Sequence, residues 1–378
     1  MTGRTDVLRV AAVQAAPEFL DAPATAAKAA RLIAEAAVGG ARLVAFGEGF
    51  LPTHPIWMHT LPVTSPRQIE LAGRLVDSAI RIPGPETAVL AEAARAAGVT
   101  VVLGCVERMA GTSPQLALAA LVIDPDGTVL SRRKLVPAVG ERVLFTAGGA
   151  ESIRTFPTPW GPMAVLLGGE NSNPLLTWTM REMGARLHIA CWPPHFNKPG
   201  VMGETSTVTG RAVAYQNTAY VVSVAGATTP EIREAISRTP EDRALLDAMA
   251  EDPASTVYAP RGAKMAGPLA GGEGILYADL DLSAGSWAGL VNRHYDRPDL
   301  FKVTIERGNP APALAFDDPA MAVGDDDEVT VRARALVEAR YGGTLPVADR
   351  DRLVPFVEGM LRTSGQLEAL DPDGGGRA

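Results

Sequence analysis

The sequence predicts an α/β fold in which helices cover a sheet that contains both parallel and antiparallel strands. Short apolar runs alternate with segments of high helix propensity from Val10 to Leu280, a rhythm typical of crossover connections between parallel strands. One pair of runs is joined only by the turn sequence Asp124-Pro125-Asp126-Gly127, which predicts an antiparallel hairpin. No Pro-rich or Ser-rich linker interrupts this region, so we expect one α/β domain.

In the first half of the chain, each helix is bounded by residues that start or stop helices. The Ala-rich segment 24–38 has strong helix propensity and ends at Gly39-Gly40. A second helix opens at Gly84-Pro85-Glu86 and ends at Gly98. The strands that alternate with these helices are predicted at residues 10–14, 42–46, 99–105, 118–123 and 128–131.

The second half repeats the alternation and adds a sharp turn from strand to helix. Strands are predicted at residues 163–167, 187–191, 219–224 and 275–280, with helices over 174–184 and up to Asn217. After the first of these strands, Ser172 or Asn173 can act as the N-cap and Pro174 as the first helical residue. This is the geometry of a nucleophile elbow, but its tip, Gly168, has no side chain.

The C-terminal part of the chain has a different composition. An acidic cluster at residues 325–328 is followed by an Arg-rich helix, and the final residues DPDGGGRA read as a frayed tail. We therefore divide the chain into a domain of residues 1–310 and an extension of residues 311–378 that contains helices and a flexible tail.

Composition and charge exclude several classes of protein. Hydrophobic residues make up 47% and charged residues 21% of the chain, as in folded, water-soluble proteins. The net charge of -8 and the pI near 5.3 disfavour nucleic acid as a partner, and no apolar run reaches membrane length. Two cysteines, Cys105 and Cys191, cannot form a four-cysteine zinc site, and a disulfide framework is not expected. We expect a cytoplasmic protein with no membrane or nucleic-acid partner.

Two charged side chains, Glu48 and Lys134, lie close behind predicted strands, where open α/β sheets collect catalytic groups. Glu48 lies among apolar residues, and burial of a carboxylate raises its pKa toward that of a usable general base. Lys134 could stabilise an oxyanion, and Glu141, seven positions later, would keep the ammonium charged. The alternatives are that Glu48 is a solvated loop residue and that Lys134 is one more surface base beside Arg132 and Arg133. Glu141 could likewise belong to a surface ion pair.

Other residues near these strand ends are candidates for a substrate pocket. His54 and Trp57 follow Glu48 closely, and Trp192 and Pro193 follow a later strand. Both groups could line a pocket with aromatic and apolar surface, or they could simply pack in the core. A metal site at His54 and His59 is not expected, because a proline between them prevents a regular helix and no cysteine cluster supports them.

Six motifs occur along the chain in a characteristic order. They are VAAVQAAP near the start, FGEGFLPTHP around Glu48, RKLVPAVGER around Lys134 and Glu141, GGENSNPL after the strand at residues 163–167, WPPHF at residues 192–196 and HYDRPDLF at residues 294–301. In these motifs and their spacing, about residues 7 to 305 resemble the nitrilase superfamily of carbon-nitrogen hydrolases, and within it the nitrilase branch.

The resemblance implies a four-layer αββα sandwich, a homodimer or larger spiral homo-oligomer, and neither a metal nor an organic cofactor. It implies Glu48 as the general base, Lys134 as the oxyanion stabiliser and Glu141 as a further carboxylate at the site. In the family, a cysteine at the elbow attacks the nitrile carbon, and water converts the resulting thioimidate and acyl thioester to acid and ammonia. This chain has Gly168 where that cysteine belongs. We also expect Glu170 and Asn171 of the elbow to contact the substrate.

The glycine predicts a nearly inactive scaffold of a hydrolase that converts small organic nitriles to carboxylic acids and ammonia. Removal of a covalent nucleophile deletes the thioester route. Folding and ligand binding should survive, because glycine relieves strain at the elbow and leaves a small void beside Glu48 and Lys134. Cys191 ends a neighbouring strand and could substitute for the nucleophile, although a buried structural thiol is the commoner reading. The alternative functions are an amidase of the same superfamily and a non-catalytic binding or filament-forming homologue.

Overall fold

The computed structural model describes residues 7–111, 115–195, 198–252, 254–283, 300–305 and 328–341, together with 350–351, 354–355 and 357. The chain forms two compact units, Met1–Arg307 and Gly308–Ala378. In the second unit, helix α9 (Glu328–Tyr341) buries Ala333 and Val337 together with Val354. The predicted flexible tail lies outside the described residues. Among the helices that are described, none is both long and apolar enough to cross a membrane.

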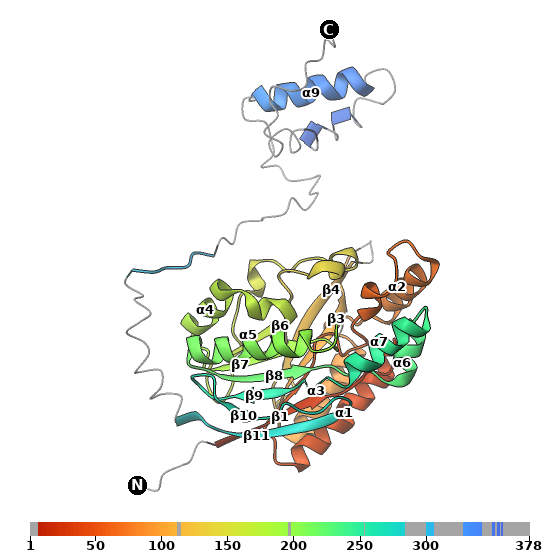
Figure 1. Cartoon of the computed structure of the whole chain (residues 1–378). Helices are drawn as coiled ribbons and strands as arrows, with labels where there is room; N and C mark the ends of the chain where they lie inside the picture. The colour runs from red at the N-terminus through yellow and green to blue at the C-terminus, as the bar shows by residue number, and fades with distance from the viewer. Residues whose placement is uncertain are drawn as a thin grey trace. The chain divides into compact units, whose positions relative to one another are not determined.

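The first sheet of the first unit is mixed, as the sequence predicts (Figure 1). Its strand order is β11-β1-β2-β3-β4-β5. The β1–β2 and β2–β3 pairs are parallel, and the other pairs are antiparallel, including the predicted hairpin of β4 and β5. The strands are β1 (Val7–Gln14), β2 (Leu43–Phe46), β3 (Thr100–Arg108), β4 (Leu116–Ile123), β5 (Val129–Arg133) and β11 (Gly274–Asp281).

The second sheet has the order β10-β9-β8-β7-β6. Its strands β6, β7 and β8 are parallel, and β9 and β10 are antiparallel to their neighbours. The strands are β6 (Met163–Leu167), β7 (Leu187–Trp192), β8 (Tyr220–Ala225), β9 (Thr256–Tyr258) and β10 (Lys264–Ala266). The strand predicted at residues 163–167 is confirmed with its bounds. The strand predicted at 187–191 extends one residue further, and the one predicted at 219–224 begins and ends one residue later.

Helices cover the outer face of each sheet. Helices α1 (Ala22–Val38) and α3 (Pro85–Ala97) pack on the first sheet, and α4 (Pro174–Glu182) and α5 (Val201–Asn217) pack on the second (Figure 1). Apolar side chains from the inner faces of both sheets form the central core. The predicted four-layer αββα sandwich is confirmed. Helices α2 (Pro66–Ser78), α6 (Pro230–Ile236) and α7 (Pro240–Ala250) were not predicted.

The bounds of α1 follow from a side-chain cap. The Asp21 carboxylate accepts a hydrogen bond from Ala24 N at 2.9 Å, so the helix begins at Ala22, two residues before the predicted start. The helix ends at Gly39, as predicted. Of the two predicted N-caps of α4, Ser172 and Asn173, the structure has Asn173, whose side-chain oxygen accepts from Leu175 N and Leu176 N.

The loop after β2 that carries Glu48 contacts the second sheet through its backbone. Glu48 N donates to Trp192 O at 2.9 Å, which joins the loop after β2 to the end of β7. A Cβ atom on Gly47 would lie 2.5 Å from Gly226 N and 2.7 Å from Trp192 O, both backbone atoms. Glycine at position 47 therefore permits the contact that places Glu48 between the sheets.

Candidate active site

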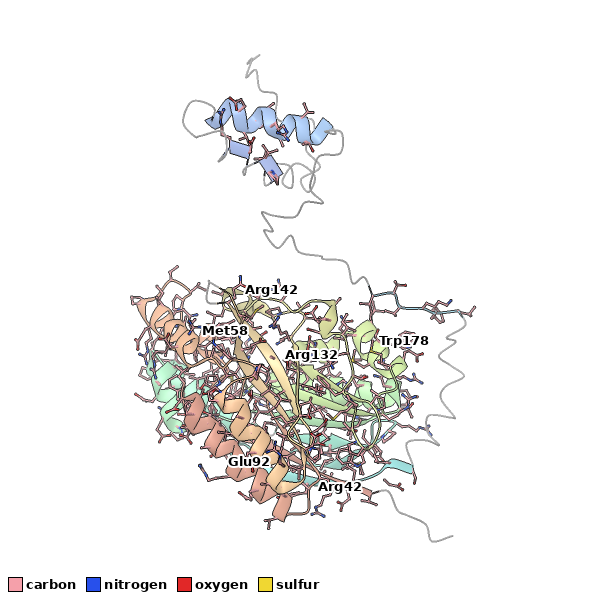
Figure 2. The ribbon with its side chains drawn as sticks, turned by 180° about the vertical axis from the view of Figure 1, so that it is seen from behind. Arg42, Met58, Glu92, Arg132, Arg142 and Trp178 are labelled. Atoms are coloured by element: carbon pink, nitrogen blue, oxygen red, sulfur yellow. The ribbon has the colours of Figure 1, made fainter. Side chains whose placement is uncertain are left out.

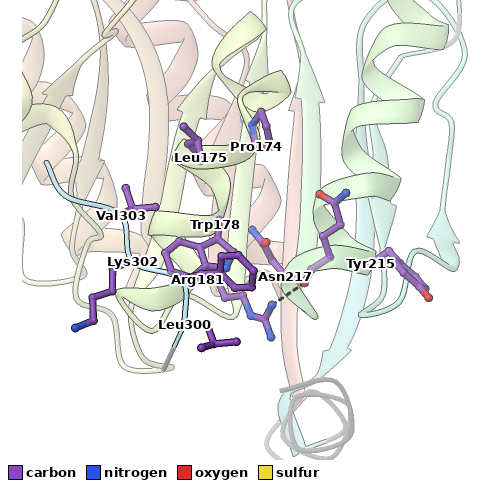
Figure 3. Close-up of a pocket in the computed structure, with 11 residues that line it drawn as sticks. Pro174, Leu175, Trp178, Arg181, Tyr215, Asn217, Leu300, Lys302 and Val303 are labelled. Carbon is purple, nitrogen blue, oxygen red and sulfur yellow. Dashed lines mark hydrogen bonds between the residues drawn. The ribbon is translucent and has the colours of Figure 1, made fainter. Parts of the chain in front are cut away.

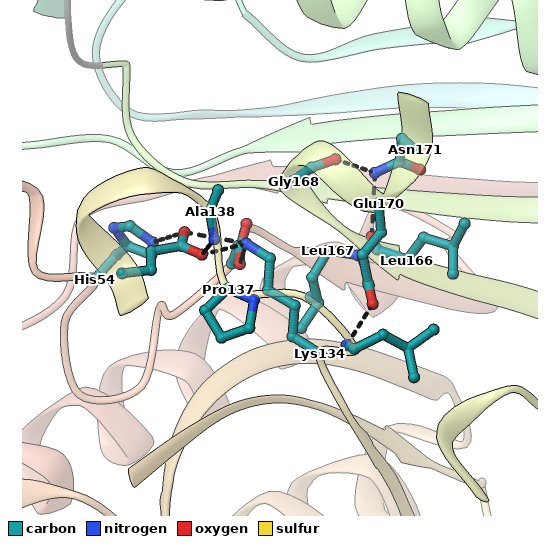
Figure 4. Close-up of polar contacts among 12 residues, drawn as sticks. His54, Lys134, Pro137, Ala138, Leu166, Leu167, Gly168, Glu170 and Asn171 are labelled. Carbon is teal, nitrogen blue, oxygen red and sulfur yellow. Dashed lines mark hydrogen bonds and ion pairs between the residues drawn. The ribbon is translucent and has the colours of Figure 1, made fainter. Parts of the chain in front are cut away.

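Glu48, Lys134 and Glu141 form one buried cluster between the two sheets. Lys134 Nζ donates to Glu48 Oε1 at 2.7 Å and to the two Glu141 oxygens at 2.7 and 3.0 Å (Figure 4). Glu48 follows β2, Lys134 follows β5, and Glu141 lies in the 3₁₀ helix η2 (Val139–Val143). Each of the three residues is at most 3% exposed. The exposed alternatives for these three residues are wrong, because all three are buried between the sheets.

The cluster holds two carboxyl groups and one ammonium, so its charges cannot all be balanced within it. Glu141 has further donors, His54 Nε2 at 3.2 Å and Ala138 N at 2.6 Å. Burial acts to raise the pKa of Glu141, but the His54 hydrogen bond and the Lys134 charge outweigh it and lower that pKa to about 2. Glu141 is therefore the group that stays ionised.

Glu48 is the carboxyl group that can take up a proton. Its Oε2 is buried and has no hydrogen-bond partner among the described residues. Burial raises the pKa of Glu48 to about 8, and the Lys134 charge offsets only part of this effect. Burial also opposes the charge on Lys134, but the two carboxylates outweigh it and raise the Lys134 pKa. A carboxyl group with a pKa near neutrality suits a general base.

A metal reading of this cluster conflicts with the position of Lys134. Glu48, His54 and Glu141 each offer a ligand atom, and these atoms lie within 4.8 Å of one another. The Lys134 ammonium bonds to both carboxylates, so it already occupies the place of a cation between them. His54 belongs to this cluster through its contact with Glu141. His59, with which the sequence analysis paired it, is not one of the three grouped residues.

The elbow brings Gly168 to the same cluster. Gly168 directly follows β6, opens the 3₁₀ helix η4 (Gly168–Ser172) and has a φ of +46°, a left-handed conformation that side chains rarely adopt. A Cβ atom at this position would lie 2.5 Å from Glu48 Oε2 and 3.3 Å from Lys134 Nζ. The predicted void is wrong, because the Glu48 carboxylate fills the space next to Gly168.

Glu170 makes its polar contacts inside the protein. Its carboxylate accepts two hydrogen bonds from Arg132 at 2.7 and 2.8 Å, one from Leu135 N at 2.7 Å and one from Leu167 N at 2.9 Å. Its partner Arg132 lies among the strands and is buried. Charged side chains on the outer helices differ in this respect, because Glu92 of α3, for example, is exposed (Figure 2). The predicted substrate contact of Glu170 stays a prediction.

Asn171 supports the elbow from the helix side of the second sheet. Its Nδ2 donates to Gly168 O at 2.8 Å (Figure 4). Its Oδ1 lies 2.8 Å from His188 Nε2. Burial lowers the pKa of His188 to about 4, so the ring is neutral and donates through Nε2. The substrate contact predicted for Asn171 also stays a prediction.

Arg132 and His188 were missed as site residues. One signal for Arg132 is its spacing, because a residue two positions before Lys134 on a strand points to the same face. His188 has no comparable signal in the sequence.

The predicted aromatic wall is buried. Trp57 packs edge-on against Phe19, with ring centroids 6.0 Å apart, in the core between the sheets. Trp192 packs with Val213 and Tyr258 beneath α5. Both rings thus serve the core, and the pocket-lining roles of Trp57, Trp192, His54 and Pro193 stay predictions.

Cys191 lies in the core between the sheets and is fully buried. Burial raises the pKa of its thiol above the ordinary value, which disfavours the reactive thiolate. Cys105 is likewise buried, and neither thiol forms a disulfide.

A further cavity lies outside the Glu48 cluster. It has a volume of about 830 Å³, and neither Glu48, Lys134, Glu141 nor Gly168 lines it. Trp178 and Arg181 of α4 face the segment 300–303 across this cavity (Figure 3). Leu300 and Phe301 close the predicted HYDRPDLF motif, whose residues 294–299 lie outside the described part of the chain.

Comparison with known proteins relates residues 9–288 to one family, because they match the family model described as carbon-nitrogen hydrolase. A nitrilase from Pseudomonas syringae pv. syringae (strain B728a) is 32% identical over 342 residues, covering 88% of this chain and 98% of that protein. An aliphatic nitrilase from Rhodococcus rhodochrous is 33% identical over 325 residues, covering 82% and 86%. A solved carbon-nitrogen hydrolase from Helicobacter pylori G27 has the same fold, with a TM-score of 0.60 and 17% identity over 79% of this chain and 98% of that one.

Proposed function

The chain belongs to the carbon-nitrogen hydrolase family, and we propose that it is a nitrilase-type scaffold in which Gly168 stands at the position of the catalytic nucleophile. The observation that carries this proposal is the direction of a side chain at position 168. A Cβ atom there would point at Glu48 Oε2 and Lys134 Nζ, the base and the cation that an attacking thiol needs.

A cysteine at position 168 would complete a route from nitrile to acid. Glu48 takes the thiol proton while sulfur attacks the nitrile carbon, and Lys134 stabilises the negative charge that develops on nitrogen. The product is a thioimidate. One water releases ammonia and leaves an acyl thioester, and a second water releases the carboxylic acid and restores the thiol. The balance is one nitrile and two waters to one acid and one ammonia.

With Gly168, no atom is available to form the thioimidate. We therefore infer that the chain itself is nearly inactive, with a rate several orders of magnitude below that of its cysteine variant. The buried thiol of Cys191 does not replace the nucleophile in this proposal. The nitrilase relatives favour a small organic nitrile as the substrate, and the predicted homo-oligomer stays a prediction.

The test is ammonia release by Gly168→Cys from a panel of aliphatic, aromatic and arylacetonitriles, with the matching amides assayed in parallel. The controls are the unchanged chain, Gly168→Ala and Gly168→Cys combined with Cys191→Ala, each checked for folding by circular dichroism. We expect activity in Gly168→Cys with and without Cys191→Ala, and none in the unchanged chain or in Gly168→Ala.

Each other outcome has a distinct meaning. Amide hydrolysis without nitrile hydrolysis would make the scaffold an amidase. A folded Gly168→Cys that acts on neither class would leave a non-catalytic binding or filament-forming homologue. Equal activity in the unchanged chain would show that position 168 is not the nucleophile position.

A further inference from the structure

We propose that Arg132 and Glu170 form a positioning clamp that holds Lys134 and Gly168 in register across the two sheets. Lys134 follows β5, an edge strand of the first sheet, and Gly168 follows β6, an edge strand of the second. No strand hydrogen bonds join the two sheets in the described residues. The distance between the ammonium and the elbow therefore depends on contacts between side chains and loops.

The Glu170 carboxylate makes the connection directly. One oxygen accepts from Leu135 N, the residue after Lys134, and the other accepts from Leu167 N, the residue before Gly168. A single planar group thus bonds to the backbone neighbours of both site residues, at 2.7 and 2.9 Å. A shift of either sheet edge would break one of these bonds.

Arg132 fixes the orientation of that carboxylate. Its guanidinium binds both Glu170 oxygens in a bidentate pair and also donates to Ser152 O and, in the second sheet, to Val165 O. The side chains of Arg132 and Glu170 are 0% and 2% exposed. A buried bidentate pair with these additional bonds holds one geometry, which is the property that a positioning device requires.

The contacts separate this role from substrate binding. Both Glu170 oxygens are occupied by donors within the protein, so a contact with substrate would require one of these bonds to break. A positioning role acts only through Lys134 and the residue at 168. Misplacement of reacting groups by about 1 Å can cost a hundredfold in rate, so loss of the clamp should lower kcat while leaving substrate affinity nearly unchanged.

A neighbouring ion pair provides a matched control. Arg133 binds Glu107 in the same bidentate manner, with two bonds of 2.7 Å. This pair joins β5 to β3 within the first sheet, and neither residue bonds to the elbow. It tests the loss of an Arg–Glu pair next to Lys134 without the loss of the connection between sheets.

The experiment has two arms. The kinetic arm rests on the proposed function and uses Gly168→Cys as the parent. Glu170→Gln and the uncharged double variant Arg132→Met/Glu170→Leu are added to it, with Glu107→Gln as the control. Glu170→Gln leaves the buried Arg132 charge without its partner charge, whereas the double variant removes both charges. The double variant therefore serves as the test if Glu170→Gln does not fold. We expect kcat to fall about 10- to 100-fold with KM within threefold, and Glu107→Gln to stay within twofold of the parent in both.

The second arm does not depend on activity. Hydrogen exchange of the Leu135 and Leu167 amides is measured in the chain with Gly168, with and without Arg132→Met/Glu170→Leu. We expect at least tenfold faster exchange at both amides in the variant and no change at either amide in Arg133→Met/Glu107→Leu. If the Gly168→Cys parent hydrolyses no substrate, the proposed function fails and this arm alone decides the clamp.

Three results would overturn the inference. A raised KM with unchanged kcat would place Glu170 on the substrate. Folded clamp variants with kcat within twofold of the parent would remove its role in catalysis. Unchanged exchange at Leu135 and Leu167 would show that Glu170 does not hold the two sheet edges.

Discussion

At the level of single residues, Glu48 determines how the cluster responds to pH. Because burial raises its pKa to about 8 from the usual 4.5, the folded protein holds a proton that the unfolded chain releases between these values. The stabilisation from this group is complete below pH 4.5 and is lost as the pH rises through 8. Glu48→Gln, which stays neutral, should remove this loss and reduce the fall in unfolding free energy between pH 5 and 9 by roughly 2–5 kcal/mol.

Urea unfolding at several pH values measures this effect, with Glu204→Gln, which removes an exposed carboxylate from α5, as the control. The contribution of Glu141 to the unfolding free energy changes with pH in the opposite direction. Its pKa of about 2 lies below 4.5, so its stabilisation is present above pH 4.5 and is lost as the pH falls toward 2. Parallel pH profiles for the parent and Glu48→Gln between pH 5 and 9 would contradict the raised pKa of Glu48.

The conformation of Gly168 carries a second prediction at this scale. Gly168→Ala must adopt a φ near +46° and place its Cβ against Glu48 Oε2, so we expect a loss of about 1–3 kcal/mol in unfolding free energy. Gly169→Ala is the matched control, because a Cβ there meets nothing within 4 Å. Equal urea midpoints for the two variants would show that the elbow is not strained at position 168.

At the level of elements, the start of α4 depends on one side chain. Asn173 Oδ1 accepts from Leu175 N at 3.0 Å and from Leu176 N at 3.2 Å. Asn173→Ala leaves both amides without this partner and should lower the unfolding free energy by about 1 kcal/mol, whereas Asn173→Ser should recover most of it. Urea unfolding compares the three proteins, and an unchanged midpoint for Asn173→Ala would mean that water caps the helix equally well.

Elements with clear boundary residues could be predicted from the sequence, and others could not. The helix after Gly84 begins with Pro85 and ends before Gly98, and β6 is an uninterrupted apolar run. Helix α2 was missed although it begins after a Ser65 cap, because few of its residues are buried and its pattern is mostly polar. Elements that rely on distant contacts give the weaker local signal.

At the scale of the whole molecule, the sequence indicated which charged residues would come together but not their other contacts. Glu48, Lys134 and Glu141 meet as expected, the first two shortly after strand ends and the third in η2. Their burial depends on the packing of two sheets that are built from different parts of the sequence. Contact with the second sheet and its elbow likewise buries Arg132, expected to be a surface base, in an ion pair with Glu170.

We therefore expect the contact between the two sheets to affect both the unfolding free energy and the position of Glu48. A substitution at Gly47 tests this. A Cβ at this position would lie 2.5 Å from Gly226 N and 2.7 Å from Trp192 O, and backbone atoms cannot rotate away as a side chain does. Gly47→Ala should separate the loop before Glu48 from β7 and lower the unfolding free energy by about 2–3 kcal/mol.

Gly73→Ala is the control, because Gly73 lies in α2 with nothing within 4 Å of its Cβ position and should become more stable by about 0.5–1 kcal/mol. In the Gly168→Cys parent, Gly47→Ala should also lower kcat, since Glu48 moves with the loop while Lys134 stays on its own strand end. Stability lost without any loss of kcat would mean that the Lys134 ion pair, rather than the contact between sheets, places the Glu48 carboxylate.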